Sequence, residues 1–383
     1  MYTGGSGGRI SVVLTGEGET FSSWAGRFRT TDAYADWDAW IYNYPTAGTI
    51  YLEEAGLDGV GDLIIKDGTT YDADCEYWEN LEDGRLYFQT PMTPDDPEDT
   101  HFRDVSLLNG AILGLPSNAV LKVDRAFITD DREMDEWEEL YFYQIDHVVF
   151  DGGEIDLPAE ASIPNVTIHV QAPGSVLKAG DGTGTFTFVP NNGCKFDGGL
   201  VVNGNLAVAT DAMLDLGGGE LTVKGDVAFN GTLLNAATST LTLGGANVAA
   251  ALNGARLGAV KVEAEKTVFT QGFDADTFVA CAPDCTEVAF AAGETFAVSE
   301  LYLNGVVAGA AGLTVKSTSD GSAWFLNAGP RQQVGGVIAQ DSDASGGSKI
   351  QADAISSVAG SCVNWTTGGK AATWTGGASG KWS

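Results

Sequence analysis

Residues 199–245 repeat one pattern roughly every twenty residues. The run Leu-Val-Val-Asn-Gly-Asn-Leu-Ala-Val at 200–208 returns as Leu-Thr-Val-Lys-Gly-Asp-Val-Ala-Phe at 221–229, and more loosely as Leu-Thr-Leu-Gly-Gly-Ala-Asn-Val at 241–248. Apolar side chains alternate with other residues on both sides of the glycine, as they do in short strands with one buried face. One copy alone cannot bury that face, so successive copies must stack. The repeat therefore predicts an all-β chain folded as a parallel β-helix, or β-solenoid.

Glycine marks the turn in each copy. Gly204, Gly225 and Gly244 fall at matching places, and glycine is the residue that adopts positive φ without steric cost. The chain has 51 glycines but only 11 prolines and no Gly-x-y period, which suits tight turns between short strands rather than collagen. We expect a sharp corner at all three glycines.

The rungs extend beyond the central repeat, with interruptions. Segments that predict further rungs are 105–123, 147–177, 286–305 and 311–329. Residues 78–103 are polar and proline-rich, which predicts a protruding loop, and the acidic residues 129–143 predict a short helix or an excursion on the flank. The predicted organisation is an N-terminal unit rich in glycine and aromatic residues (1–77), rungs with acidic insertions (78–146), regular rungs (147–370) and the start of a truncated further module (371–383).

The charge balance excludes one class of partner. The 383 residues include 52 acidic and 20 basic side chains, a net charge of −32, so the chain cannot neutralise a row of phosphates and no nucleic-acid partner is expected. Such acidity keeps an extended strand-rich surface soluble. No run approaches the roughly 18–20 apolar residues of a membrane helix, so this segment is not expected to insert into a membrane.

The order of several motifs resembles a known kind of protein. Three N-terminal stretches look like one recurrent unit: Gly4–Ile10, Ala47–Leu52 and Gly61–Ile65. Three C-terminal stretches look like the close of a module: Leu301–Gly305, Asp341–Gly347 and Asn364–Thr366. Residues 372–383 look like the start of the next one. With the Leu-x-Val-x-Gly rungs, these stretches resemble large secreted bacterial β-helix surface proteins of the adhesin-like or autotransporter-like kind.

The resemblance covers about half of the chain and carries expectations of its own. It implies a right-handed β-helix, export, and an extracellular or cell-surface location, and it transfers no catalytic residue. It also implies that the chain is a fragment. The N-terminus lacks the basic start and apolar core of a signal peptide, but in a fragment that lack does not favour the cytoplasm.

Candidate acid–base chemistry rests on one group of carboxylates. Because β-helices also include polysaccharide lyases and glycoside hydrolases, we searched the sequence for a pair of catalytic carboxylates. Glycoside hydrolysis needs two carboxylates that face each other across a groove, one of them protonated. Glu154 and Asp156, with Asp151 just before them, form the best pair. Carboxylates two apart on a strand usually form a solvated outer face, however, and we favour that interpretation.

Other ligand-type residues indicate no metal or cofactor. His147 and His169 are about one rung apart and could stack on one face, while His101 lies in the polar loop. A third metal ligand is missing, so a stacked or surface pair is favoured. The acids that could attract Ca²⁺ fit no known calcium loop, and solvated charge is the favoured interpretation; they are Asp95, Asp96, Asp99, Asp130, Asp131 and those of 133–139.

The five cysteines include one close pair, Cys281 and Cys285. They lack the second pair or the histidines of a zinc site. A disulfide across the turn and two ordinary thiols both remain open, and two thiols are favoured.

Aromatic residues are dense between residues 24 and 44. Trp24, Trp37, Trp40 and Tyr42, with Tyr34 and Tyr44 nearby, are the candidate carbohydrate-binding residues, because amphipathic rings stack on sugars. An N-terminal cap over the open end of the solenoid is the competing interpretation, and we favour it.

The sequence as a whole predicts a non-enzymatic structural or adhesive segment of an exported bacterial surface protein. Its expected partners are glycans or the surface of a host or neighbouring cell. The alternatives are a β-helix polysaccharide lyase or glycoside hydrolase, and a carbohydrate-binding module.

Overall fold

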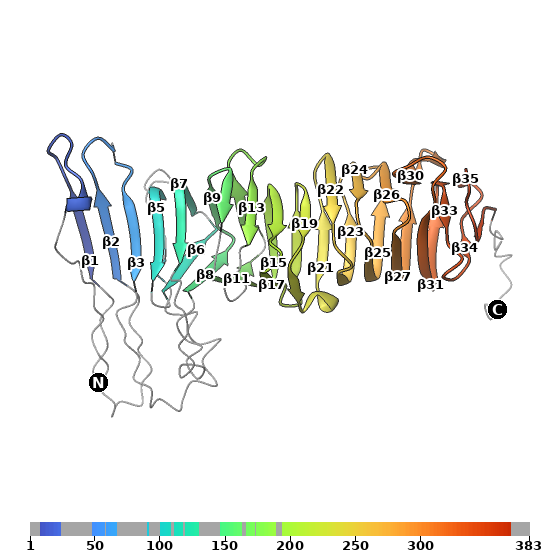
Figure 1. Cartoon of the computed structure of the whole chain (residues 1–383), viewed down its shortest axis with the longest axis horizontal. Coiled ribbons are helices and arrows are strands. Elements are labelled where there is room, and N and C mark those ends of the chain that lie inside the picture. The colour runs from blue at the N-terminus through green and yellow to red at the C-terminus, as the bar shows by residue number, and fades with distance from the viewer. Residues whose placement is uncertain are drawn as a thin grey trace, which may run out of the picture.

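The computed structural model describes residues 8–23, 48–57, 59–66, 90–91, 100–108, 111–117, 119–129, 146–162, 166–172, 174–188 and 194–368. Within these ranges the chain is a rod of stacked, mostly parallel β-coils with about ten turns. The coils follow one another along the long axis, from β1 at one end to the last strands at the other (Figure 1). The predicted all-β solenoid is therefore confirmed.

Three sheets run along the described part of the rod, and we call them sheets 1 to 3. Sheet 1 has fifteen strands, in the order β1 (Arg9–Val13), β2 (Gly48–Glu53), β3 (Asp62–Lys66), β5 (His101–Leu108), β7 (Val120–Thr129), β9 (Glu154–Leu157), β12 (Val176–Ala179), β15 (Gly199–Asn203), β18 (Glu220–Val223), β21 (Thr240–Leu243), β23 (Arg256–Val262), β25 (Phe273–Cys281), β27 (Thr295–Asn304), β31 (Trp324–Gly335) and β33 (Ser342–Asp343).

Sheets 2 and 3 are shorter than sheet 1, and they overlap only between β10 and β20. Sheet 2 has ten strands: β10 (Glu160–Ser162), β13 (Thr185–Phe188), β16 (Asn205–Val208), β19 (Val227–Phe229), β22 (Asn247–Ala251), β24 (Lys266–Phe269), β26 (Glu287–Phe290), β30 (Leu313–Ser317), β32 (Val337–Gln340) and β35 (Ser357–Ala359). Sheet 3 has seven: β4 (Thr90–Pro91), β6 (Ile112–Pro116), β8 (Asp146–Asp151), β11 (Val166–Ala172), β14 (Cys194–Asp197), β17 (Met213–Asp215) and β20 (Thr232–Leu234).

Shorter elements complete the described chain. They are the 3₁₀ turns η1 (Phe21–Ser23) and η6 (Ala236–Thr238), the antiparallel pair β28 (Val306–Val307) and β29 (Ala310–Ala311), and the parallel pair β34 (Ile350–Gln351) and β36 (Trp365–Thr366).

The cross-section of the rod changes along its length. Coils between β9 and β20 place one strand in each sheet, whereas sheet 3 ends at β20. In that last three-sided coil, β20 and η6 lie between β19 and β21. In the next coil, residues 252–255 lead directly from β22 into β23. The chain therefore takes a shorter path at this corner, and sheet 3 receives no further strand.

The register of the strands confirms the central repeat. Leu200 pairs with Leu221, which pairs with Leu241, so the three copies lie one above the other in sheet 1. In sheet 2, Leu206 pairs with Val227. The third copy departs at this point, because Val227 pairs with Ala250 and not with Val248. The looser similarity of that copy therefore reflects a longer path between its two strands.

The three repeat glycines serve different purposes. Gly204 has a positive φ of 147°. Gly225 is required by close packing, because a Cβ there would lie 2.4 Å from Asn205 Oδ1. Gly244 meets neither condition, since its Cβ would lie no closer than 3.7 Å to a neighbour, and the positive φ of 104° belongs to Gly245. The expectation of a sharp corner at Gly244 is thus wrong by one residue.

One hydrophobic core runs through the described rod, from Leu63 to Ala352. Its C-terminal half contains a stack of aromatic rings, in which the Phe290 and Trp324 rings lie 4.1 Å apart at 14°. The indole N–H of Trp324 donates to the Gln340 carbonyl oxygen at 3.1 Å, so its one polar atom is satisfied. Each fully buried large side chain contributes about 1.5–3 kcal/mol, so the stacked coils stabilise one another.

Two features differ from the expectations. β2 and β3 pair antiparallel, whereas the other neighbouring strands of sheet 1 pair parallel. The predicted loop 78–103 is also too long. β4 lies inside that range, and β5 begins at His101, where the side chain of Phe102 enters the core.

Candidate functional site

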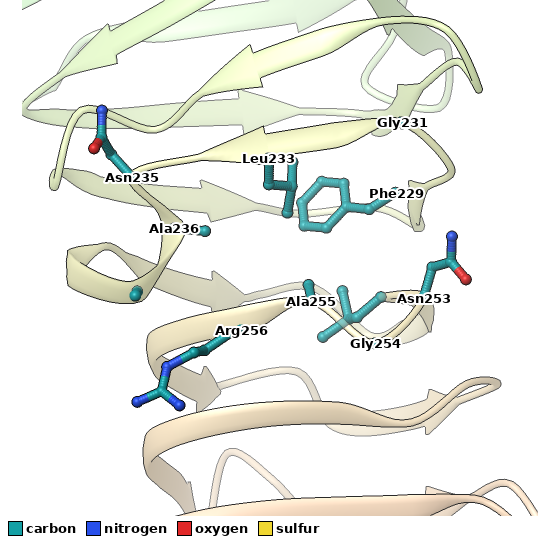
Figure 2. Close-up of a pocket in the computed structure, with 11 residues that line it drawn as sticks. Phe229, Gly231, Leu233, Asn235, Ala236, Asn253, Gly254, Ala255 and Arg256 are labelled. Carbon is teal, nitrogen blue, oxygen red and sulfur yellow. The ribbon is translucent and has the colours of Figure 1, made fainter.

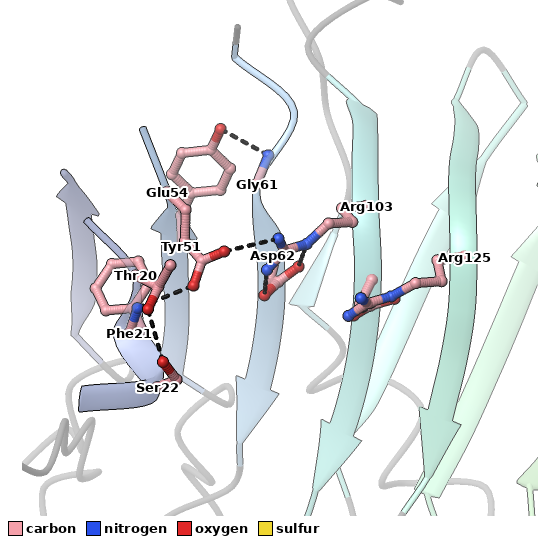
Figure 3. Close-up of polar contacts among 10 residues, drawn as sticks. Thr20, Phe21, Ser22, Tyr51, Glu54, Gly61, Asp62, Arg103 and Arg125 are labelled. Atoms are coloured by element: carbon pink, nitrogen blue, oxygen red, sulfur yellow. Dashed lines mark hydrogen bonds and ion pairs between the residues drawn. The ribbon is translucent and has the colours of Figure 1, made fainter. Parts of the chain in front are cut away.

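The outer face of sheet 1 carries ion pairs between neighbouring coils. Arg103 on β5 donates through Nε to Asp62 Oδ1 on β3 at 2.7 Å. Its Nη1 donates to Glu54 Oε2, just after the end of β2, at 3.1 Å. Glu54 also accepts the backbone N–H of Phe21 at 2.9 Å. Figure 3 shows these side chains lying side by side across adjacent strands. Arg125 makes the equivalent bidentate contact with Asp104 one coil further on.

These contacts favour the charged form of Glu54. Hydrogen bonds from the Phe21 amide and from the Arg103 guanidinium lower the pKa of Glu54. The hydrogen bond to Asp62 raises the pKa of Arg103 beyond its usual value, against the opposing effect of burial. Arg103 and Asp62 have side chains about one fifth exposed, at 21% and 22%. The network therefore links neighbouring coils through several side-chain hydrogen bonds.

Tyr51 belongs to the same end of the rod and holds the turn between β2 and β3. Its hydroxyl donates to Glu53 Oε2 or the Gly59 carbonyl, both 2.9 Å away, and accepts the Gly61 N–H at 3.0 Å. Burial, followed by the neighbouring Glu53 carboxylate, raises its pKa to about 12. Tyr51 therefore stays protonated at physiological pH, and its hydrogen bonds stabilise the turn between β2 and β3.

The carboxylates considered for acid–base chemistry do not face one another. Glu154 and Asp156 point from the outer face of β9, while Asp151 lies on β8 in sheet 3. The register places Asp156 between Lys122 and Lys178, and Lys178 Nζ lies 2.7 Å from Asp156 Oδ2. That hydrogen bond raises the pKa of Lys178. Asp156 is thus half of an ion pair on the outer face of β9.

The histidines lie in separate settings. His147 pairs in register with Thr167, and His169 with Val149, so the two are offset by two residues and are not stacked directly. His101 Nε2 lies 2.7 Å from Asp124 Oδ1 on the next strand of sheet 1. Among the described residues, no three histidine, cysteine, aspartate or glutamate side chains gather as metal ligands.

Cys281 and Cys285 are free thiols. Cys281 is exposed and Cys285 is buried, and burial raises the pKa of Cys285 to about 12. A thiol that stays protonated is a poor nucleophile. This is the arrangement of two ordinary thiols that the sequence favoured over a disulfide.

Other sequence candidates lie outside the described residues. These include the aromatic residues Trp24, Trp37, Trp40 and Tyr42, with Tyr34 and Tyr44, and the acids Asp95, Asp96, Asp99, Asp130, Asp131 and 133–139. The carbohydrate-binding and calcium hypotheses that depend on them stay predictions.

Among the hollows of the described residues is one that the sequence analysis missed. A hollow of about 320 Å³ lies between β20 and the turn 252–256, and we call it the β20 hollow. Figure 2 shows Phe229 and Leu233 projecting between the strand above and the turn at Asn253–Ala255 below. The available signal was the number of residues per corner. Asn230 to Ser239 separate β19 from β21 in one coil, but only 252–255 separate β22 from β23 in the next.

No protein-family model matches the chain, and no curated sequence or solved structure matches it. The described residues contain no helix with the length and apolarity to cross a bilayer.

Proposed function

We propose that this chain is a stiff structural rod, a stalk or display surface of an exported bacterial surface protein, and that it is not an enzyme. The observation that carries the proposal is the single core from Leu63 to Ala352 beneath one fifteen-stranded sheet. Neighbouring strands lie about 4.7–4.9 Å apart, so fifteen of them span roughly 65–70 Å.

Stiffness follows from the direction of the bonds. The strands lie across the rod, so the backbone hydrogen bonds between coils lie along it, and bending the rod must stretch them on one side. Ion pairs such as Arg103–Asp62 and Lys178–Asp156 join neighbouring coils on the outer face. The excess of acids keeps this long surface solvated and discourages side-by-side association.

A first experiment tests the shape and the absence of catalysis. Small-angle X-ray scattering of the purified chain should give the pair-distance distribution of a rod, with one short and one long dimension. Incubation with a panel of neutral and acidic polysaccharides should release neither reducing ends nor unsaturated products. Release that Glu154→Gln or Asp156→Asn abolishes, while Glu160→Gln leaves it intact, would make the chain an enzyme and end the proposal.

A second experiment separates a passive rod from an adhesive one. A glycan array probed with wild type, Trp37→Ala and Trp40→Ala measures whether the aromatic cluster binds sugars. A purely structural rod gives the same background signal for all three proteins. Specific binding by the wild type that either substitution removes would assign the chain a carbohydrate-binding role.

A further inference from the structure

The strand β20 is an open edge in the middle of the rod. It is the last strand of sheet 3, and within the described residues it pairs only with β17. The next coil takes the shorter path through 252–255, and the Gly254 N–H donates onward to the Gly272 carbonyl rather than back toward β20. Sheet 3 therefore has no eighth strand, and the β20 hollow occupies the place where that strand would lie.

The backbone of Leu233 faces this slot. On the paired side, the Thr232 N–H donates to the Ala212 carbonyl at 2.9 Å, and the Leu234 carbonyl accepts the Leu216 N–H at 3.1 Å. Successive residues of a strand direct their backbone groups to opposite sides. The N–H and C=O of Leu233 therefore point away from β17, and no described strand receives them.

The hollow is lined by both polar and apolar side chains. The Leu233 side chain enters from above (Figure 2), whereas Phe229 and Leu252 line the hollow but are almost fully buried. Asn253 and Arg256 stand at the rim. A backbone donor and acceptor beside a concave surface match an extended peptide, which supplies a complementary acceptor, donor and alternating side chain.

Charge selects among the possible occupants. A second copy of this chain would bring another net charge of −32 to the interface, which disfavours self-association through so short an edge. Arg256, the cation at the rim, already lies 3.3 Å from Asp276. The net charge of −32 of the whole chain favours a partner with basic residues beside its strand.

We propose that the β20 edge is an interaction site that is completed by an extended peptide strand of a partner protein, apolar at the residue that faces the hollow and basic at its flanks. The peptide adds to β20 as the next strand of sheet 3. It exchanges backbone hydrogen bonds with Leu233 and places one apolar side chain beside the half-buried Leu233 side chain. This site adds a docking function to the rod and does not depend on its proposed structural role.

The probe is a fluorescein-labelled peptide of sequence Lys-Lys-Val-Thr-Val-Thr-Val-Lys-Lys, measured by fluorescence anisotropy in 150 mM salt. Its matched control has the same sequence with the central backbone amides N-methylated, so it keeps the charge and loses the hydrogen bonds. We expect the control to bind at least tenfold more weakly, because attraction to the acidic surface alone is screened at this salt concentration.

The protein variants locate the site. Proline is tolerated on edge strands where its missing N–H faces outward, so Leu233→Pro removes the donor at the hollow and leaves the bonds to β17. It should weaken peptide binding at least tenfold, while Leu233→Val, which keeps the N–H, changes it less than about threefold. If Leu233→Pro does not fold by circular dichroism, Ala255→Leu, which fills the hollow from the opposite side, should give the same loss.

Three outcomes overturn the proposal. They are no binding of the probe up to 1 mM, equal binding of the N-methylated control, and binding that survives both Leu233→Pro and Ala255→Leu. Sedimentation equilibrium adds a fourth: a wild-type dimer that becomes monomeric in Leu233→Pro would assign the edge to a second copy instead.

Discussion

The carboxamide oxygen of Asn205 accepts the backbone N–H of Asp226 in the next coil, at 2.8 Å. Asp226 repeats the interaction, because its Oδ1 accepts the backbone N–H of Ala249 at 2.7 Å. Each residue follows the corner glycine of its coil. The corner between sheets 1 and 2 is therefore held by a ladder of side chains that cap the backbone of the following coil.

This ladder predicts the effect of truncating its first member. Asn205→Ala leaves the Asp226 N–H without its protein acceptor, and we expect the free energy of unfolding to fall by about 0.5–1.5 kcal/mol. Urea unfolding followed by circular dichroism measures the change. Asn203→Ala, two residues earlier on the outer face, is the control. An equal loss in the control would contradict the role of the ladder.

The repeat glycines Gly225 and Gly244, from successive coils, should respond differently to alanine. At Gly225 an added Cβ would lie 2.4 Å from Asn205 Oδ1 and 2.6 Å from the Gly204 carbonyl oxygen, so backbone must move. We expect Gly225→Ala to cost about 1–3 kcal/mol, as overpacking does. Gly244→Ala has space and should change stability by less than about 0.5 kcal/mol. Equal denaturation midpoints for the two variants would contradict this difference.

Arg103 should not be replaceable by lysine. Its fork binds Asp62 through two nitrogens and Glu54 through a third, which an ammonium group cannot reproduce. We expect Arg103→Lys to lower the free energy of unfolding by about 1–2 kcal/mol and to raise the pKa of Glu54, which NMR titration of the carboxyl carbon measures.

Arg256→Lys is the matched control for this substitution. Its pair with Asp276 is 3.3 Å long and more than half exposed, at 67% and 52%. Exposed pairs contribute little, so we expect a change of less than about 0.5 kcal/mol. A loss as large as that of Arg103→Lys would show that the fork geometry is unimportant.

Asp341 should make the C-terminal coils sensitive to acid. This carboxylate is buried and accepts the N–H groups of Ser361 at 2.8 Å and Gly321 at 2.9 Å, which lower its pKa in that order of importance. A pKa below the unfolded value of about 3.9 gives stability that is present above that value and is lost as the pH falls through the folded pKa.

The comparison with Asp341→Asn checks this prediction. Asparagine tolerates the positive φ of 52° at this position but replaces one acceptor oxygen with a donor. We expect wild type to be the more stable protein at pH 6, and the difference in free energy of unfolding to shrink as the pH falls below about 4. A difference that stays constant with pH would show that the charge of Asp341 does not contribute.

The sequence by itself determined that coils stack and which side chains face inward. Leu200, Leu221 and Leu241 align through their spacing alone, because the alternation of a strand and the position of a turn glycine are local properties of the chain. The same reasoning placed Glu154 and Asp156 on an outer face, which the alternating burial of β9 confirms.

Only the tertiary structure decided which side chains of neighbouring coils lie opposite one another. The partners of Arg103, Asp156 and Asp341 sit about one or two coils away, and the register depends on how many residues each corner uses. The end of sheet 3 and the β20 hollow arise from one corner that is shorter than its neighbour. A local pattern does not encode such differences, because the path length of each corner is settled only when coils pack against one another.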